Sequence, residues 1–124
     1  MTGGVEAVKR IFERWKAGRR KGLVLTMVAI QSLRERGKDA TEKAIREEGA
    51  RILRETEGRV DWGVSEPEYT PSLVSGLLRE LEELGVVEAG DGASGARTYR
   101  ISRSAEEEFL SRFGHLMQLV RMPK

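Results

Sequence analysis

The stretch at residues 69–102 constrains the fold of this chain most, because it predicts a helix that runs directly into a two-stranded hairpin. Thr70 is a favourable N-cap residue, Pro71 suits the first helical position, and Gly85 can take the left-handed conformation just past the helix end. Apolar residues recur between these signals at helical spacing on one face: Leu73, Val74, Leu77, Leu78, Leu81 and Leu84. We therefore expect a helix over residues 70–84.

The residues after this helix alternate like paired strands. An extended run begins at Val86, a polar, glycine-rich turn lies between Gly90 and Gly95, and the chain returns at residues 98–101. Apolar runs separated by such a turn are typical of an antiparallel hairpin. We expect that hairpin over residues 86–102.

This order of elements resembles the recognition helix and wing of winged helix-turn-helix regulators, particularly the PadR-like and MarR-like groups. Their leucine-rich recognition helix ends in an LExxGLV turn, and this chain has LEELGVV at residues 81–87. Their hairpin returns as a YxLT-like strand before a helix, and here YRIS at residues 99–102 precedes SAEEEFL. The resemblance implies a mainly α fold with a small β-hairpin, in the α+β class, with a winged helix-turn-helix core over residues 23–102.

Two further helices are expected inside that core. Residues 23–36 form the most hydrophobic segment and predict the central helix. Residues 39–42 fit a capping box that begins a second helix, which runs to about Thr56 and contains Gly49 as a weak point. The loop that follows carries Trp62, which we expect to be an anchor packed on the core and not a base-stacking residue.

The chain carries its positive charge at the N-terminus. The net charge is +2, but residues 1–22 hold seven Lys or Arg against two Glu, so the rest is slightly acidic. Residues 1–22 predict a basic amphipathic helix that ends near Gly18, followed by Arg19, Arg20 and Lys21. This tripeptide either complements the dipole of the helix end or forms an arm that meets phosphate.

The last segment, residues 103–124, predicts a helix that begins in a second capping box at residues 104–107 and ends at Pro123. Four apolar residues fall at spacings typical of a short coiled-coil seam: Phe109, Phe113, Leu116 and Val120. This seam can fold back on its own domain or pair with its copy in a second chain. Winged-helix regulators usually dimerise through terminal helices, so we expect a homodimer with this segment as the dimerisation helix.

The residue types of an active site are not arranged as catalysis requires. There is no cysteine, and His115 has no second histidine with which to share a metal ion. The glycine-rich segment at residues 90–95 lacks the lysine and helix of a phosphate-binding loop. We therefore expect no catalytic residue, no metal and no cofactor. The longest apolar run is too short to span a bilayer and no secretory leader is recognisable, so we expect a cytoplasmic protein without membrane contact.

Two functions of different classes follow. By the resemblance, the chain is a sequence-specific regulator that binds double-stranded DNA as a dimer. Its expected DNA-binding residues are Thr70, Ser72, Ser75 and Arg79 on the recognition helix, Arg97 and Arg100 in the wing, and Arg19, Arg20 and Lys21 in the arm. The alternative is a winged-helix module for protein–protein interaction in a transcription or replication assembly, which Gly76 and Glu80 fit better. Sequence leaves the operator, the regulated genes and any effector open.

Overall fold

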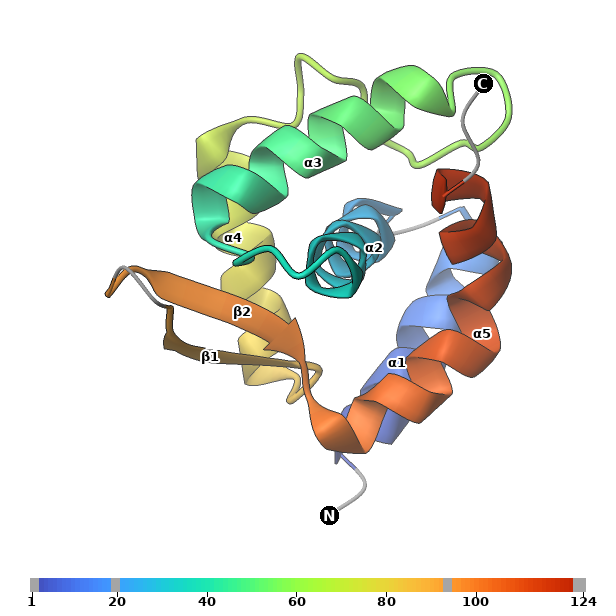
Figure 1. Ribbon diagram of the computed structural model, residues 1–124. Coiled ribbons are helices and arrows are strands. Elements are labelled where there is room, and N and C mark those ends of the chain that lie inside the picture. The colour runs from blue at the N-terminus through green and yellow to red at the C-terminus, as the bar shows by residue number, and fades with distance from the viewer. Residues whose placement is uncertain (1–2, 19–20, 93–94, 122–124) are drawn as a thin grey trace.

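The structure is a computed structural model that describes residues 3–18, 21–92 and 95–121. The described part contains helices and one two-stranded antiparallel hairpin: α1 (Gly3–Lys16), α2 (Lys21–Glu35), α3 (Glu42–Glu55), α4 (Pro71–Glu83), β1 (Val87–Asp91), β2 (Arg97–Ile101) and α5 (Arg103–Arg121). Figure 1 shows α2 at the centre, with α1 and α5 on one side of it and α4 and the hairpin on the other. The expected α+β composition is confirmed.

The central helix α2 is buried on all sides, since every residue from 22 to 33 is buried. It packs against each of the other four helices and against β2. Its buried hydroxyls have partners, as such groups must. Thr26 donates to the carbonyl of Gly22 at 2.9 Å and accepts from the Tyr69 hydroxyl at 2.8 Å. Burial raises the pKa of Tyr69, so its hydroxyl stays protonated and remains a donor.

The terminal helices α1 and α5 pack on each other through aromatic rings. Phe12 and Trp15 of α1 contact Phe113 of α5 edge-to-face, with centroid distances of 5.4 and 5.7 Å. Phe109 adds a tilted contact to Phe113 at 5.6 Å. Such pairs add to the stabilisation from area burial. They join the two ends of the described chain into one layer beside α2.

This packing corrects the expected dimer seam. Phe109 and Phe113 are fully buried within the single chain, and Leu116 and Val120 are 2% and 8% exposed. The apolar spacing along α5 is real, but α1 of the same chain covers it. On the outer side, Leu110 is the one exposed large hydrophobic side chain in the part of the chain that the structure describes. The predicted seam is therefore core and is not available to a second copy.

The junction between α4 and the hairpin is a helix end built around Gly85. The residue lies at φ +76°, so the expected left-handed conformation is confirmed. Val86 N–H donates to the carbonyl of Leu81 at 3.0 Å, and Gly85 N–H donates to that of Glu82 at 3.0 Å. These two bonds form a Schellman motif, which satisfies the last carbonyls of the helix and directs the chain into β1.

The hairpin pairs Val87 with Ile101 and Asp91 with Arg97 at its two ends. Its return strand is also tied to the segment before α3, because Tyr99 N–H donates to the carbonyl of Ala40 at 3.0 Å. An isolated bridge between Thr41 and Thr98 extends this contact. The hairpin is therefore attached both to the end of α4 and to the segment before α3.

Three helix starts differ from the expected ones. Helix α2 begins at Lys21 and not at residue 23. The N-cap of α3 is Thr41 and not Asp39, since the Thr41 hydroxyl accepts from Ala44 N–H at 3.1 Å. Helix α5 begins one residue before Ser104, because the carbonyl of Ser102 accepts from the backbone N–H groups of residues 105 and 106.

The loop between α3 and α4 is held by two buried aromatic residues. Trp62 is 2% exposed and donates its indole N–H to the Thr56 hydroxyl at 2.8 Å, so its expected role as an anchor is confirmed. Tyr69 lies against Gly49 of α3, where an added Cβ would come within 2.2 Å of the ring carbon Cε2. Gly49 is thus a packing requirement and not only a weak point in the helix.

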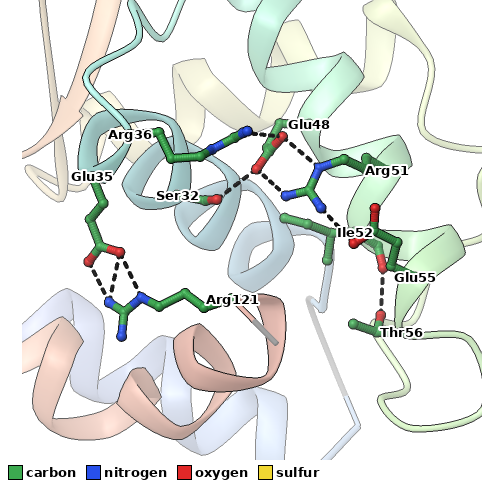
Figure 2. A network of polar contacts seen from close by, with 9 residues as sticks. All are labelled: Ser32, Glu35, Arg36, Glu48, Arg51, Ile52, Glu55, Thr56 and Arg121. Atoms are coloured by element: carbon green, nitrogen blue, oxygen red, sulfur yellow. Dashed lines mark hydrogen bonds and ion pairs between the residues drawn. The ribbon is translucent and has the colours of Figure 1, made fainter. Parts of the chain in front are cut away.

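A buried carboxylate joins α2 to α3 (Figure 2). Glu48, 5% exposed, accepts from the Ser32 hydroxyl at 2.6 Å and from Nε and Nη2 of Arg51 at 3.0 and 2.6 Å. Arg36 Nη2 lies 2.6 Å from Oε1 of the same carboxylate. Burial alone would raise the pKa of Glu48, but the hydrogen bonds from Arg51 and Ser32 and the two guanidinium charges outweigh burial and lower that pKa. The carboxylate is therefore charged at neutral pH.

We predict opposite effects for alanine at two helix-interior glycines. Gly49→Ala should lower the free energy of unfolding by about 2 kcal/mol, because the new methyl group collides with the Tyr69 ring. Gly76→Ala, where an added Cβ meets nothing within 4 Å, should raise that free energy by roughly 0.5 to 1 kcal/mol through helix propensity. Urea melts of both variants and the parent measure this. A stabilised Gly49→Ala would contradict the packing described.

A second prediction concerns the acid side of the stability profile. The pKa of Glu48 is lower in the folded protein than in the unfolded chain, where it is roughly 4.3. The charged carboxylate therefore stabilises the fold above that pH, and this stabilisation is lost as pH falls through the pKa of the folded state. Glu48→Gln should therefore cost about 2 kcal/mol at pH 7, and its difference from the parent should shrink below about pH 4. The control is the exposed neighbour Glu47→Gln, which should change stability by less than about 0.5 kcal/mol. Equal effects of the two substitutions would refute this role of Glu48.

Candidate nucleic-acid interface

Helix α4 has one side packed against the core and one side exposed to solvent, which we call its free side. Thr70 caps it, accepting from Leu73 N–H at 3.2 Å with its hydroxyl oxygen. Val74, Leu78 and Leu81 are buried where the helix packs against α2 and α3. The opposite side carries small polar groups and charges that the core does not use: Ser72, Ser75, Gly76, Arg79 and Glu83. All of these are exposed except Ser75, which is half-buried.

Arg79 lies near the middle of this free side. Its side chain is exposed and makes no hydrogen bond or ion pair with any residue in the described part of the chain. An arginine carries five N–H donors in a planar fork that suits phosphate and guanine edges. The donors of Arg79 are therefore free for an external partner.

Gly76 lies one turn before Arg79 on the same side. Glycine in a helix interior costs about 1 kcal/mol relative to alanine, so its presence calls for a reason. Packing supplies none, since the residue is exposed and an added Cβ would meet open space. Its backbone conformation does not require glycine either, because its φ is not positive. What glycine does provide here is a surface on which another molecule can approach the helix backbone closely.

The two hairpin arginines lie on opposite faces of the sheet. Arg97 Nη2 donates to both carboxylate oxygens of Glu82 on α4, at 3.0 and 2.8 Å. Its guanidinium also lies over the Tyr99 ring, 5.7 Å from the centroid, and the charge of Glu82 raises the pKa of Arg97. Arg100 is loosely paired, 3.6 Å from Glu88 on the neighbouring strand. The structure thus places the expected phosphate contacts of the hairpin next to carboxylates.

Arg100 borders a surface cleft of about 360 Å³ that sequence reasoning missed. Arg34 at the end of α2 and Arg103 at the start of α5 line the same cleft, together with Glu35 and Glu106. Glu35 is itself bound by Arg121 at 2.6 Å (Figure 2). No sequence pattern signals this grouping, because Arg34 is far in the chain from Arg100 and Arg103.

The basic tripeptide at residues 19–21 lies mostly outside the described part of the chain. Arg19 and Arg20 lie outside the described residues, and of Lys21 only the backbone, at the start of α2, is described. The helix before them is part of the core, since Val8 and Ile11 of α1 are buried. The predicted phosphate contacts of this segment remain a prediction.

The helix–hairpin unit, residues 71–101, is acidic on balance. It contains three arginines and five carboxylates, and the exposed carboxylates include Glu83, Glu88 and Asp91. Since phosphate neutralisation supplies much of the affinity for nucleic acid, this balance limits how tightly one such unit can bind.

No group of three or more His, Cys, Asp or Glu side chains in the described ranges is placed to hold a metal ion. His115 is exposed and lies against the Trp15 ring at 6.3 Å. None of the described helices is both long and apolar enough to cross a membrane.

The chain was compared with protein-family models, with curated proteins and with solved structures, and none of them matches it.

Proposed function

We propose that this chain is a winged-helix protein that binds duplex DNA through the free side of α4 and the adjoining hairpin. The observation that carries the proposal is the pairing of Gly76 with Arg79 on α4. One is an unforced glycine that opens the helix backbone to close approach, and the other is an exposed arginine without a described partner. Together they suit a helix that enters a groove and donates hydrogen bonds there.

The order and attachment of the elements support a winged-helix arrangement. Two core helices, α2 and α3, precede the candidate recognition helix α4, and the hairpin follows it after the short connection at residues 84–86. The isolated bridge between Thr41 and Thr98 ties the segment that joins α2 and α3 to the return strand of the hairpin. These contacts hold the hairpin beside α4, which supports the proposal that it serves as a wing.

In this proposal the N-terminal half of α4 lies in the major groove. The hydroxyls of Ser72 and Ser75 donate to phosphate or base edges, and Thr70 lies near the backbone at the positive end of the helix dipole. Arg79 reaches a guanine edge or a phosphate. Arg100 faces phosphate from the other side of the hairpin. Binding as a dimer would require a surface other than the buried α5 seam.

A second candidate function is supported by the acidity of residues 71–101. Five carboxylates against three arginines suit a basic protein surface better than a phosphate backbone. In that case Gly76 would admit a partner's side chain or backbone, and the same face of α4 would be the docking surface. Salt-dependent DNA binding separates the two candidates.

We predict that Arg79→Ala selectively weakens binding to a preferred site. The parent should bind random duplex with an affinity that falls as salt rises, and a site selected from a random library should bind more tightly. Loss of a base contact at Arg79 should weaken the selected site by about 1 to 3 kcal/mol. The control is Arg10→Ala, an exposed arginine on α1 on the far side of α2 (Figure 1), which should change binding little. Fluorescence anisotropy over a salt series measures both, and a parent without salt-dependent binding refutes DNA recognition.

We also predict that Gly76→Gln blocks the interface without harming the fold. Glutamine is a good helix former and the position is open, so the free energy of unfolding should not fall. Its side chain should hold the helix backbone away from the groove and weaken DNA binding roughly tenfold or more. Gly114→Gln on α5, another helical glycine with open space around it, is the matched control. Unchanged DNA binding by Gly76→Gln would show that DNA does not approach the α4 backbone closely at this position.

A further inference from the structure

The ion pair between Glu82 and Arg97 links the two parts of the proposed DNA-binding surface. Glu82 lies in the last turn of α4, and Arg97 is the first residue of β2. Both carboxylate oxygens accept from the same guanidinium nitrogen, at 2.8 and 3.0 Å, although the Arg97 side chain remains 61% exposed. Asp91 lies directly across the hairpin from Arg97 in the strand register. Arg97 therefore binds one carboxylate, on the helix, and has a second acidic residue opposite it on the neighbouring strand.

The ion pair between Glu82 and Arg97 is not part of the core packing. The pair lies at the surface, beside an open cleft of about 460 Å³ that Glu82, Asp91 and Arg97 line. Exposed pairs of this kind contribute little to stability. A DNA phosphate offers Arg97 the same chemistry as a carboxylate, two anionic oxygens for a guanidinium. Contact with phosphate would therefore exchange one anion for another.

We propose that Glu82 competes with DNA phosphate for Arg97 and so holds down the affinity of the helix–hairpin unit. This inference rests on the proposed DNA-binding function. In the free protein Arg97 is mostly occupied, so it neutralises no phosphate unless the pair first opens. An exposed ion pair and an exposed phosphate contact are of comparable strength, each favoured over its open form by roughly 1.5- to 5-fold. The parent therefore gains little by exchanging one for the other, and its DNA complex largely keeps the pair with Glu82. Release of Arg97 should thus tighten binding by about two- to sixfold.

The chain offers a matched control on the same hairpin. Glu88 is a carboxylate of the same unit and lies 3.6 Å from Arg100, with 47% of its side chain exposed. Glu88→Gln removes the same charge as Glu82→Gln from nearly the same place, but it releases no closely held guanidinium. The difference between these two variants therefore isolates release of Arg97 from a general loss of negative charge.

The test measures binding of a random-sequence duplex by the parent, Glu82→Gln, Glu88→Gln, Arg97→Ala and the double variant Glu82→Gln/Arg97→Ala. The salt series runs from about 50 to 200 mM, with thermal unfolding as a check on the fold. We expect Glu82→Gln to bind two- to sixfold tighter than the parent, with a salt slope steeper by about 0.9, one added phosphate contact. Glu88→Gln should gain less than about twofold. Arg97→Ala should hardly change the parent but should abolish the gain in the Glu82→Gln background.

Each contrary outcome has a distinct meaning. Equal gains from Glu82→Gln and Glu88→Gln overturn the competition, because charge alone would then explain both. A large loss for Arg97→Ala in the parent overturns it as well, since Arg97 would already contact phosphate. If the parent shows no salt-dependent binding at low salt, the DNA proposal and the competition fail together. Salt-dependent binding with no difference among the variants removes the competition alone.

Discussion

Burial of α2 over residues 22–33 is the constraint on which the other elements depend. A helix satisfies its own backbone groups, but its buried side-chain hydroxyls must find partners on other elements. Thr26 meets Tyr69 from the loop before α4, and Ser32 meets Glu48 on α3. These contacts fix α3 and the start of α4 relative to one centre. The free side of α4 therefore has a defined direction, away from α2, before any function is considered.

The helix-interior glycines of α3 and α4 have different structural reasons, because their surroundings differ. Gly49 lies under the Tyr69 ring, where even a methyl group would collide, so packing explains it fully. Gly76 faces open space on the side of α4 that the core leaves unused. Both reduce helix propensity by the same amount, and only the first is compensated within the chain. An uncompensated weakness on a surface helix is the kind of local inconsistency expected at a functional site.

The arginines show the same dependence on environment. Sequence alone does not distinguish three arginines of this unit, Arg79, Arg97 and Arg100, and it predicts a DNA contact for each. In the structure Arg79 has free donors, Arg97 is held by Glu82, and Arg100 lies loosely near Glu88. The carboxylates of the helix–hairpin unit are thus unevenly paired, since Glu82 and Glu88 lie beside the hairpin arginines and no carboxylate in the described part pairs with Arg79. Charge counting alone cannot distinguish a free cation from a neutralised one.

Sequence determined the features that depend on residues close together in the chain: the helices, the left-handed Gly85 and the hairpin, whose two strands are joined by a short turn. Trp62 was also predicted correctly, because a lone tryptophan in a loop is costly to expose. Tertiary structure alone decided which surface covers each element. The α5 seam has the spacing of a coiled coil, but periodicity carries no information on whether its partner is α1 or a second chain. Contacts such as Glu82 with Arg97, or Gly49 with Tyr69, join residues 15 to 20 positions apart, and they form only when the packed core brings those residues together.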